Sequence, residues 1–246
     1  MDMNVVFTRL KELYLASYQV VERMSIADLM DYLINNNPDA YFMNTRSMGK
    51  LYGEEELALF EAAKSDPTLS ELYGNVKKDI TGDHDALVAK IKEEIIESLE
   101  LIKEKVAKED FEEKNQIIFL EHDYSPYFYW CGFGEGEYSL LSEPKYIKYS
   151  RKEFYNGIGK IDFSEYCTRI NELEEYLEEL GILDSVADAD PYLQFRSAYR
   201  YKLYILLHRA FSEIPLTAFE GIPTKLPLYI YGNEHDCEVM NVYIYD

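Results

Sequence analysis

The clearest hydrophobic pattern in the chain lies between residues 84 and 114. Six aliphatic residues recur there at spacings of four, four, four, three and four, with charged residues between them. They are Leu87, Ile91, Ile95, Leu99, Ile102 and Val106. This period places one apolar stripe on a charged helix, so we expect a long helix with one face in the core. A coiled-coil strand is the alternative, which the stripe disfavours because it holds fewer than three regular heptads.

Helical spacing also dominates the chain before this segment. An apolar stripe from Val5 to Val21 predicts a first helix. Ser25 followed three residues later by Asp28 forms a capping box that predicts the start of a second. Acidic residues 54–56 favour a third helix start, since carboxylates are stabilised near the positive end of a helix. Pro67 suits the first position of a short fourth helix.

From residue 115 onward, β-branched and aromatic residues become frequent. The runs 116–120 and 127–130 flank a turn sequence and predict a hairpin, as do 228–231 and 239–245 near the end of the chain. Segments 138–141 and 146–149 predict further strands. Two helices are expected between these strands, at about 164–180 and 191–211.

The segregation of helices and strands indicates an α+β fold. We expect a helical N-terminal half followed by an antiparallel sheet of hairpins with two packed helices. The change in composition near residue 114 divides the chain into a helical lobe, 1–114, and an α+β lobe, 115–246. Because the flank of this boundary is helix-like, the two lobes are expected to pack together, and a single compact domain is the alternative.

Charge then narrows the choice of partner. The chain carries 46 Asp and Glu against 25 Lys and Arg, a net charge of −21. Such a field repels phosphates and anionic membranes, so the sequence predicts no direct nucleic-acid or membrane partner and favours a basic protein. We see no signal peptide or membrane span, and the three widely spaced cysteines are typical of reduced thiols in a cytoplasmic protein.

The acidic excess is concentrated between residues 162 and 190, which hold ten carboxylates and one basic residue, Arg169. Carboxylates spaced four apart on a helix repel one another, and acids at its C-terminal end face the negative end of the dipole. A helix whose charges lower its own stability is a candidate functional surface. The predicted partner-binding residues are Glu165, Glu172, Glu174, Glu175, Glu178, Glu179, Asp184 and Asp188.

Two other interpretations of this acidic row stay open. The following helix carries Arg196, Arg200, Lys202 and Arg209, which would neutralise part of the row if the two helices pack side by side. The row is also compatible with a solvated face that keeps the protein soluble.

A second candidate chemistry comes from three triplets in which a histidine stands between an acid and an aspartate. They begin at Asp83, Glu121 and Glu234. Histidine and carboxylate are ligands for zinc, manganese or iron, so convergence of the last two triplets would assemble His122, Asp123, His235 and Asp236 as a metal site. Capping and turn chemistry is the favoured interpretation, with Asp83 or Asp85 capping the long helix.

No motif in the chain names a reaction, so we expect no catalytic residue and no cofactor. The acidic, tyrosine-rich α+β composition is similar to that of bacterial immunity proteins, which neutralise secreted toxins. This is a similarity of type and implies no site residue. It implies a non-enzymatic protein that docks on a basic partner, such as a toxin or nuclease, and blocks it. The alternatives are a metal-dependent hydrolase that uses the histidine triplets, and a phage or regulatory scaffold protein.

Overall fold

The computed structural model describes residues 3–35, 52–122, 126–150, 152–234 and 238–246, and confirms the α+β class. Five helices precede the first strands in this part of the chain, namely α1 (Met3–Arg23), α2 (Ile26–Asn35), α3 (Glu54–Ala63), α4 (Pro67–Thr81) and α5 (Asp85–Val106). Strands β1 (Asn115–His122), β2 (Tyr127–Phe133) and β3 (Glu153–Asp162) follow. Helices α6 (Ser164–Glu179), α7 (Leu183–Ala187) and α8 (Asp190–Ser212) come next. A short 3-10 helix, η2 (Leu216–Phe219), then precedes strands β4 (Thr224–Glu234) and β5 (Met240–Tyr245).

The chain divides into two compact units, each built from separate stretches of sequence. Unit 1 comprises Met1–Leu13, Asp83–Glu165 and Tyr201–Asp246. Unit 2 comprises Tyr14–Gly82 and Tyr166–Arg200. The boundary near residue 114 therefore falls within unit 1, and the independence of segment 1–114 as a lobe stays a prediction.

Unit 1 contains a five-stranded sheet in the order β3-β2-β1-β4-β5. Both predicted hairpins are present, since β1 pairs antiparallel with β2 and β4 pairs antiparallel with β5. The expectation of a purely antiparallel sheet is wrong, because β1 and β4 are parallel. The two hairpins pair through their first strands, β1 and β4. Whether these strands run parallel or antiparallel depends on the long connection between β2 and β4. No local pattern encodes such a non-local choice.

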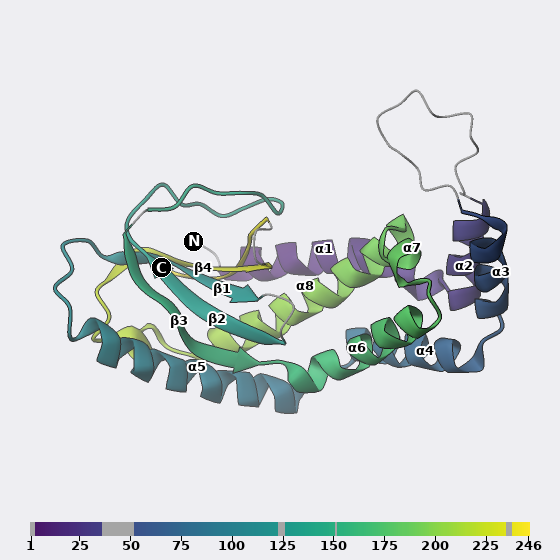
Figure 1. Ribbon diagram of the computed structural model, residues 1–246. Coiled ribbons are helices and arrows are strands. Elements are labelled where there is room, and N and C mark those ends of the chain that lie inside the picture. The colour runs from purple at the N-terminus through teal and green to yellow at the C-terminus, as the bar shows by residue number, and fades with distance from the viewer. Residues whose placement is uncertain (1–2, 36–51, 123–125, 151, 235–237) are drawn as a thin grey trace, which may run out of the picture. The chain divides into compact units, whose positions relative to one another are not determined.

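One face of this sheet is covered by helices. Figure 1 shows α5 running along the sheet beside β3. From α8, Phe211 contacts Trp130 of β2, with ring centroids 5.9 Å apart. All six residues of the stripe predicted for α5 are buried, which confirms that this helix turns one face into the core.

The other face of the sheet is covered by the irregular segment 134–150. The strands predicted at 138–141 and 146–149 are absent from it, apart from a single bridge between Lys145 and Val239. Two of its tyrosines instead contact rings of the sheet. The Tyr149 ring centroid lies 5.2 Å from that of Phe119 and 4.7 Å from that of Phe133, and the Tyr138 centroid lies 6.2 Å from that of Tyr229. Strand β3, which sequence analysis did not predict, pairs with β2 instead. Its alternation is interrupted by two glycines with positive φ, Gly157 and Gly159, which explains why the pattern was missed.

The helix starts of unit 2 follow local sequence rules. Ser25 and Asp28 form the predicted capping box, in which the Asp28 carboxylate accepts from the Ser25 N–H at 2.8 Å and the Ser25 Oγ accepts from the Asp28 N–H at 3.1 Å. Pro67 occupies the first turn of α4, and the Asp66 carboxylate accepts from the Leu69 N–H at 2.9 Å. Within the described ranges, no helix combines the length and apolar character that crossing a membrane requires.

Candidate functional site

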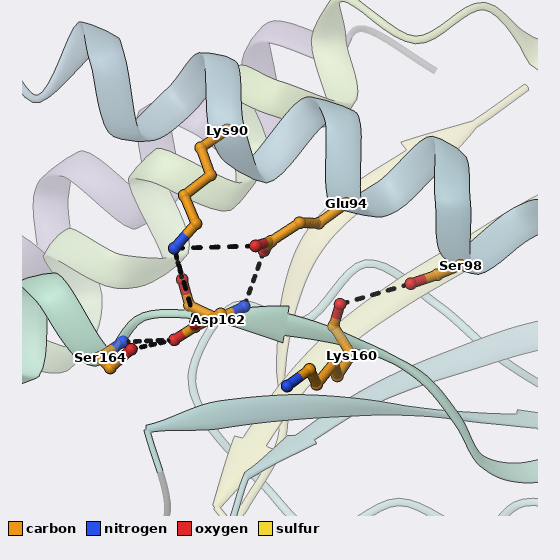
Figure 2. Close-up of polar contacts among 6 residues, drawn as sticks. All are labelled: Lys90, Glu94, Ser98, Lys160, Asp162 and Ser164. Atoms are coloured by element: carbon orange, nitrogen blue, oxygen red, sulfur yellow. Dashed lines mark hydrogen bonds and ion pairs between the residues drawn. The ribbon is translucent and has the colours of Figure 1, made fainter.

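Helix α6 carries most of the predicted partner-binding residues, and its start is anchored in unit 1. Figure 2 shows Asp162, at the end of β3, accepting from the Ser164 N–H at 2.8 Å and from the Ser164 hydroxyl. The Asp162 N–H donates to Glu94 of α5 at 2.7 Å. The Asp162 carboxylate therefore satisfies the backbone N–H of Ser164, the first residue of α6.

The Asp162 carboxylate is held in its charged form. Burial by itself would raise its pKa, but the two hydrogen bonds from Ser164 and the positive charge of Lys90 outweigh burial and lower the pKa below its usual range. Lys90 lies 3.6 Å from Asp162 and 3.7 Å from Glu94. These contacts hold the last residue of β3 against α5 within unit 1.

The C-terminal end of α6 is closed by a Schellman motif, as the glycine at position 181 predicts. Gly181 has a φ of 72°, which only glycine adopts readily. Its N–H donates to Glu178 O at 2.8 Å, and the Ile182 N–H donates to Leu177 O at 3.0 Å. The motif stops the helix and turns the chain into α7.

Helix α6 has one buried face and one charged face. Tyr166, Ile170, Leu173 and Leu177 are buried, and Leu180 is partly exposed. On the opposite side the carboxylates face solvent, and the exposed members are Glu165, Glu172, Glu175, Glu178 and Glu179. Asp184 of α7 and Asp188, which follows α7, are exposed as well. We call Glu172, Glu175, Glu178 and Glu179 the α6 acidic row.

The basic residues near α6 neutralise little of this row. Arg196 lies 3.7 Å from Glu174, which also accepts a hydrogen bond from the Tyr192 hydroxyl at 3.1 Å. Glu174 is thus the predicted site residue that the structure removes from the free surface. Arg169 pairs with Asp79 of α4 at 2.5 Å.

In unit 1, Arg209 of α8 pairs with the acids that flank the start of α5. It lies 3.1 Å from Asp83 and also contacts Asp85. The expectation that Asp83 or Asp85 caps α5 is wrong, because His84 takes the N-cap position with a φ of 59° and no side-chain cap bond. Among the residues that the structure describes, no ion pair reaches any member of the α6 acidic row.

The single tryptophan of the chain is not available as an aromatic anchor for a partner. Trp130 has no exposed surface in the core of unit 1. Tyr199, Tyr201 and Tyr204, which alternate with basic residues along α8, are buried and are therefore unable to stack on nucleic acid. On α6 itself, Tyr176 is partly exposed and donates to Asp66 Oδ2 at 3.0 Å.

The alternative metal site falls mostly outside the described residues. Asp123, His235 and Asp236 belong to segments 123–125 and 235–237, of which nothing is described, so convergence of the two turns stays a prediction. His122 lies at the end of β1, with its ring centroid 4.6 Å from that of Phe128. Within the described ranges, no group of three or more His, Cys, Asp and Glu side chains is arranged to hold a metal ion.

A cavity on the outer face of the sheet was not predicted from sequence. It measures about 410 Å³ and lies between the strands and segment 134–150. Its lining includes two carboxylates and several aromatic rings: Glu121, Glu153, Phe119, Phe133, Tyr146 and Tyr149. The sequence signal for this cavity was weak. It consists of alternate residues of β1 and β2, and the residues that face them across the cavity come from a distant, irregular segment.

Comparison with known proteins adds no relative, since no family model, curated protein or solved structure matches this chain.

Proposed function

We propose that this chain is a non-enzymatic, cytoplasmic binding protein that docks through the α6 acidic row on a basic protein and blocks it, in the manner of an immunity protein. The observation that carries the proposal is the exposure of Glu172, Glu175 and Glu179 on one regular helix, with no ion pair to a described residue.

The arrangement opposes the stability of the helix. Glu175 and Glu179 stand four residues apart, and Glu178 and Glu179 stand at the helix end where the dipole is negative. Each unfavourable pair costs a few tenths of a kcal/mol, about 0.2–0.5. A surface that retains such a cost has a use that offsets it, and steering a partner of opposite charge is the direct use of a concentrated field.

The shape of the surface supports docking on a large partner. The α6 acidic row spans two helical turns, roughly 10 Å at 1.5 Å per residue. Asp184 and Asp188 extend the same sign of charge into α7 and beyond it. Charges on an interface rim raise the association rate more than the affinity, so binding is expected to be fast and strongly weakened by salt.

The test is affinity capture of the tagged protein from its native lysate, at low and high salt, beside the variant Glu172→Lys, Glu175→Lys, Glu179→Lys. The matched control is Glu93→Lys, Glu97→Lys, Glu104→Lys, which changes the net charge equally on exposed residues of α5. Captured proteins are identified by mass spectrometry, and their association rates are then measured over a salt series.

The proposal predicts a basic partner that wild type and the α5 variant retain and that the α6 variant loses. Its association rate constant should fall about tenfold or more in the α6 variant. Equal loss of the partner in both variants would mean that binding depends only on the net charge of the protein, and α6 would no longer be the docking surface. Retention in the α6 variant would overturn the proposal outright.

A further inference from the structure

The cavity on the outer face of the unit 1 sheet has the features of a ligand site. Its volume, about 410 Å³, lies within the range of about 300–1,000 Å³ that small-molecule pockets occupy. Aromatic rings form its walls, including Phe119 and Phe133 from the strands and Tyr149 from the covering segment. The Phe133 and Tyr149 ring centroids are 4.7 Å apart, so one wall is a packed aromatic surface.

The polar groups of the cavity come from neighbouring strands. Glu121 of β1 and Asn233 of β4 are register partners in the parallel pair, so their side chains project side by side from one face of the sheet. Cys131 of β2 and Asn156 of β3 are register partners in the next pair. All four residues line the cavity together with Glu153.

Asn233 supplies the observation that points to a ligand. It is 8% exposed, and its side-chain nitrogen donates to Glu234 O at 3.2 Å. Its side-chain oxygen is buried and has no hydrogen-bond partner among the described residues. A buried acceptor without a donor is unfavourable, so a donor supplied by a ligand would stabilise this position.

The thiol of Cys131 completes the electrostatic character of the cavity. Burial, reinforced by the negative charge of Glu121, raises its pKa to about 11 and keeps it protonated at neutral pH. The sulfur lies 3.1 Å from Asn156 Oδ1 and 3.7 Å from Glu121 Oε2, so it acts as a weak donor to the cavity's own acceptors. None of the described residues that line the cavity is basic. The cavity therefore offers acceptors, carboxylates and aromatic faces.

We propose that this cavity binds an organic cation, a guanidinium or ammonium group, between the aromatic walls and the acceptors Glu121 and Asn233. A guanidinium fits best, because its plane stacks on rings while its edge donates to a carboxylate and to a neighbouring amide oxygen. The two carboxylates, Glu121 and Glu153, disfavour an anion by charge repulsion. The proposal is independent of the α6 acidic row.

The test measures binding of butylguanidine to the full-length protein by calorimetry and by amide chemical shifts. Butylurea, which has the same shape without charge, is the control ligand, and butylamine separates guanidinium from ammonium recognition. The variants are Glu121→Gln and Asn233→Leu, with Glu97→Gln on exposed α5 as the control for the net charge. Circular dichroism establishes that each variant is folded.

The proposal predicts saturable binding of butylguanidine, about tenfold or more tighter than butylurea, with shifts centred on Phe119, Glu121 and Asn233. Glu121→Gln and Asn233→Leu should each weaken binding about tenfold, while Glu97→Gln should leave it unchanged. Equal binding of the cation and the urea, or equal weakening by Glu121→Gln and Glu97→Gln, would overturn the site in favour of diffuse attraction to an acidic surface.

Two further arms identify the source of the cation and separate this site from the docking proposal. A free cation is indicated if butylguanidine binds as tightly as an arginine-containing peptide. The side chain of a partner protein is indicated if the peptide binds more tightly. The α6 triple lysine variant should bind butylguanidine like wild type, so failure of either proposal leaves the other open to its own test.

Discussion

Replacement of Gly132 by alanine tests how closely the Tyr155 ring of β3 packs against the backbone of β2. A Cβ at Gly132 would lie 2.3 Å from the Tyr155 Cζ and 2.5–2.7 Å from two further ring carbons. Real Cβ atoms essentially never approach other atoms so closely, so the Tyr155 ring must move by about 1 Å to reach normal van der Waals contact. The ring has little room, because Tyr155 is 2% exposed.

The movement also breaks a buried hydrogen bond. The Tyr155 hydroxyl donates to Asn115 Oδ1 at 3.0 Å, and the Asn115 amide donates in turn to Ile117 O and Phe133 O at 2.9 and 2.8 Å. Overpacking costs about 1–3 kcal/mol, and losing a buried hydrogen bond adds about 1 kcal/mol. Removing the flexibility of a strand glycine returns roughly 0.5–1 kcal/mol. We therefore expect a loss of about 2–3 kcal/mol in the free energy of unfolding.

The assay is chemical denaturation followed by the fluorescence of Trp130, which is fully buried two residues from the substitution and reports on unit 1. The matched control is Gly74→Ala in α4, where no atom lies within 4 Å of the added Cβ. Followed by circular dichroism, it should raise stability by about 0.5–1 kcal/mol. In a Tyr155→Leu background, Gly132→Ala should cost less than about 1 kcal/mol. An unchanged or raised stability of Gly132→Ala would refute the packing argument.

Three further predictions concern charged and reactive groups. Asp162→Asn should lower stability by about 1 kcal/mol at neutral pH, because the charged carboxylate accepts two bonds from Ser164. The pKa of Asp162 is lowered in the folded state, so its contribution to stability is present above the unfolded pKa and is lost as pH falls through the folded pKa. When the wild type and the Asp162→Asn variant are compared as pH is lowered, the difference in their free energy of unfolding should therefore vanish. Alkylation of Cys131, followed by mass spectrometry, should be slow at neutral pH and accelerate roughly tenfold per pH unit up to about pH 10, and a fast, pH-independent reaction would contradict the raised pKa. Glu179→Lys should raise thermal stability slightly, by about 0.5 kcal/mol, because a cation suits the last turn of α6, and a destabilised variant would show that Glu179 has a structural partner.

Sequence patterns located the helices well because their signals are local. The stripe from Leu87 to Val106 is buried as its spacing predicts, and the capping box at Ser25 and the glycine at position 181 mark a helix start and a helix end. The exposed carboxylates of α6 were also predicted from spacing alone, since burial of one face of a helix fixes the other. The docking function assigned to them is a proposal.

Other features depended on residues far apart in the chain. The parallel pairing of β1 with β4, the covering of the sheet by segment 134–150 and the pairing of Arg209 with the acids at the start of α5 are all non-local. The cavity is the clearest case, because Glu121 and Asn233 become neighbours only when β1 and β4 pair. The sequence by itself determined where the longer helices lie and which helical faces stay charged, since short-range spacing encodes both, whereas the short helices α7 and η2 were not predicted. Only the tertiary structure decided which strands meet and which acceptors share a cavity, because those choices depend on how distant segments pack.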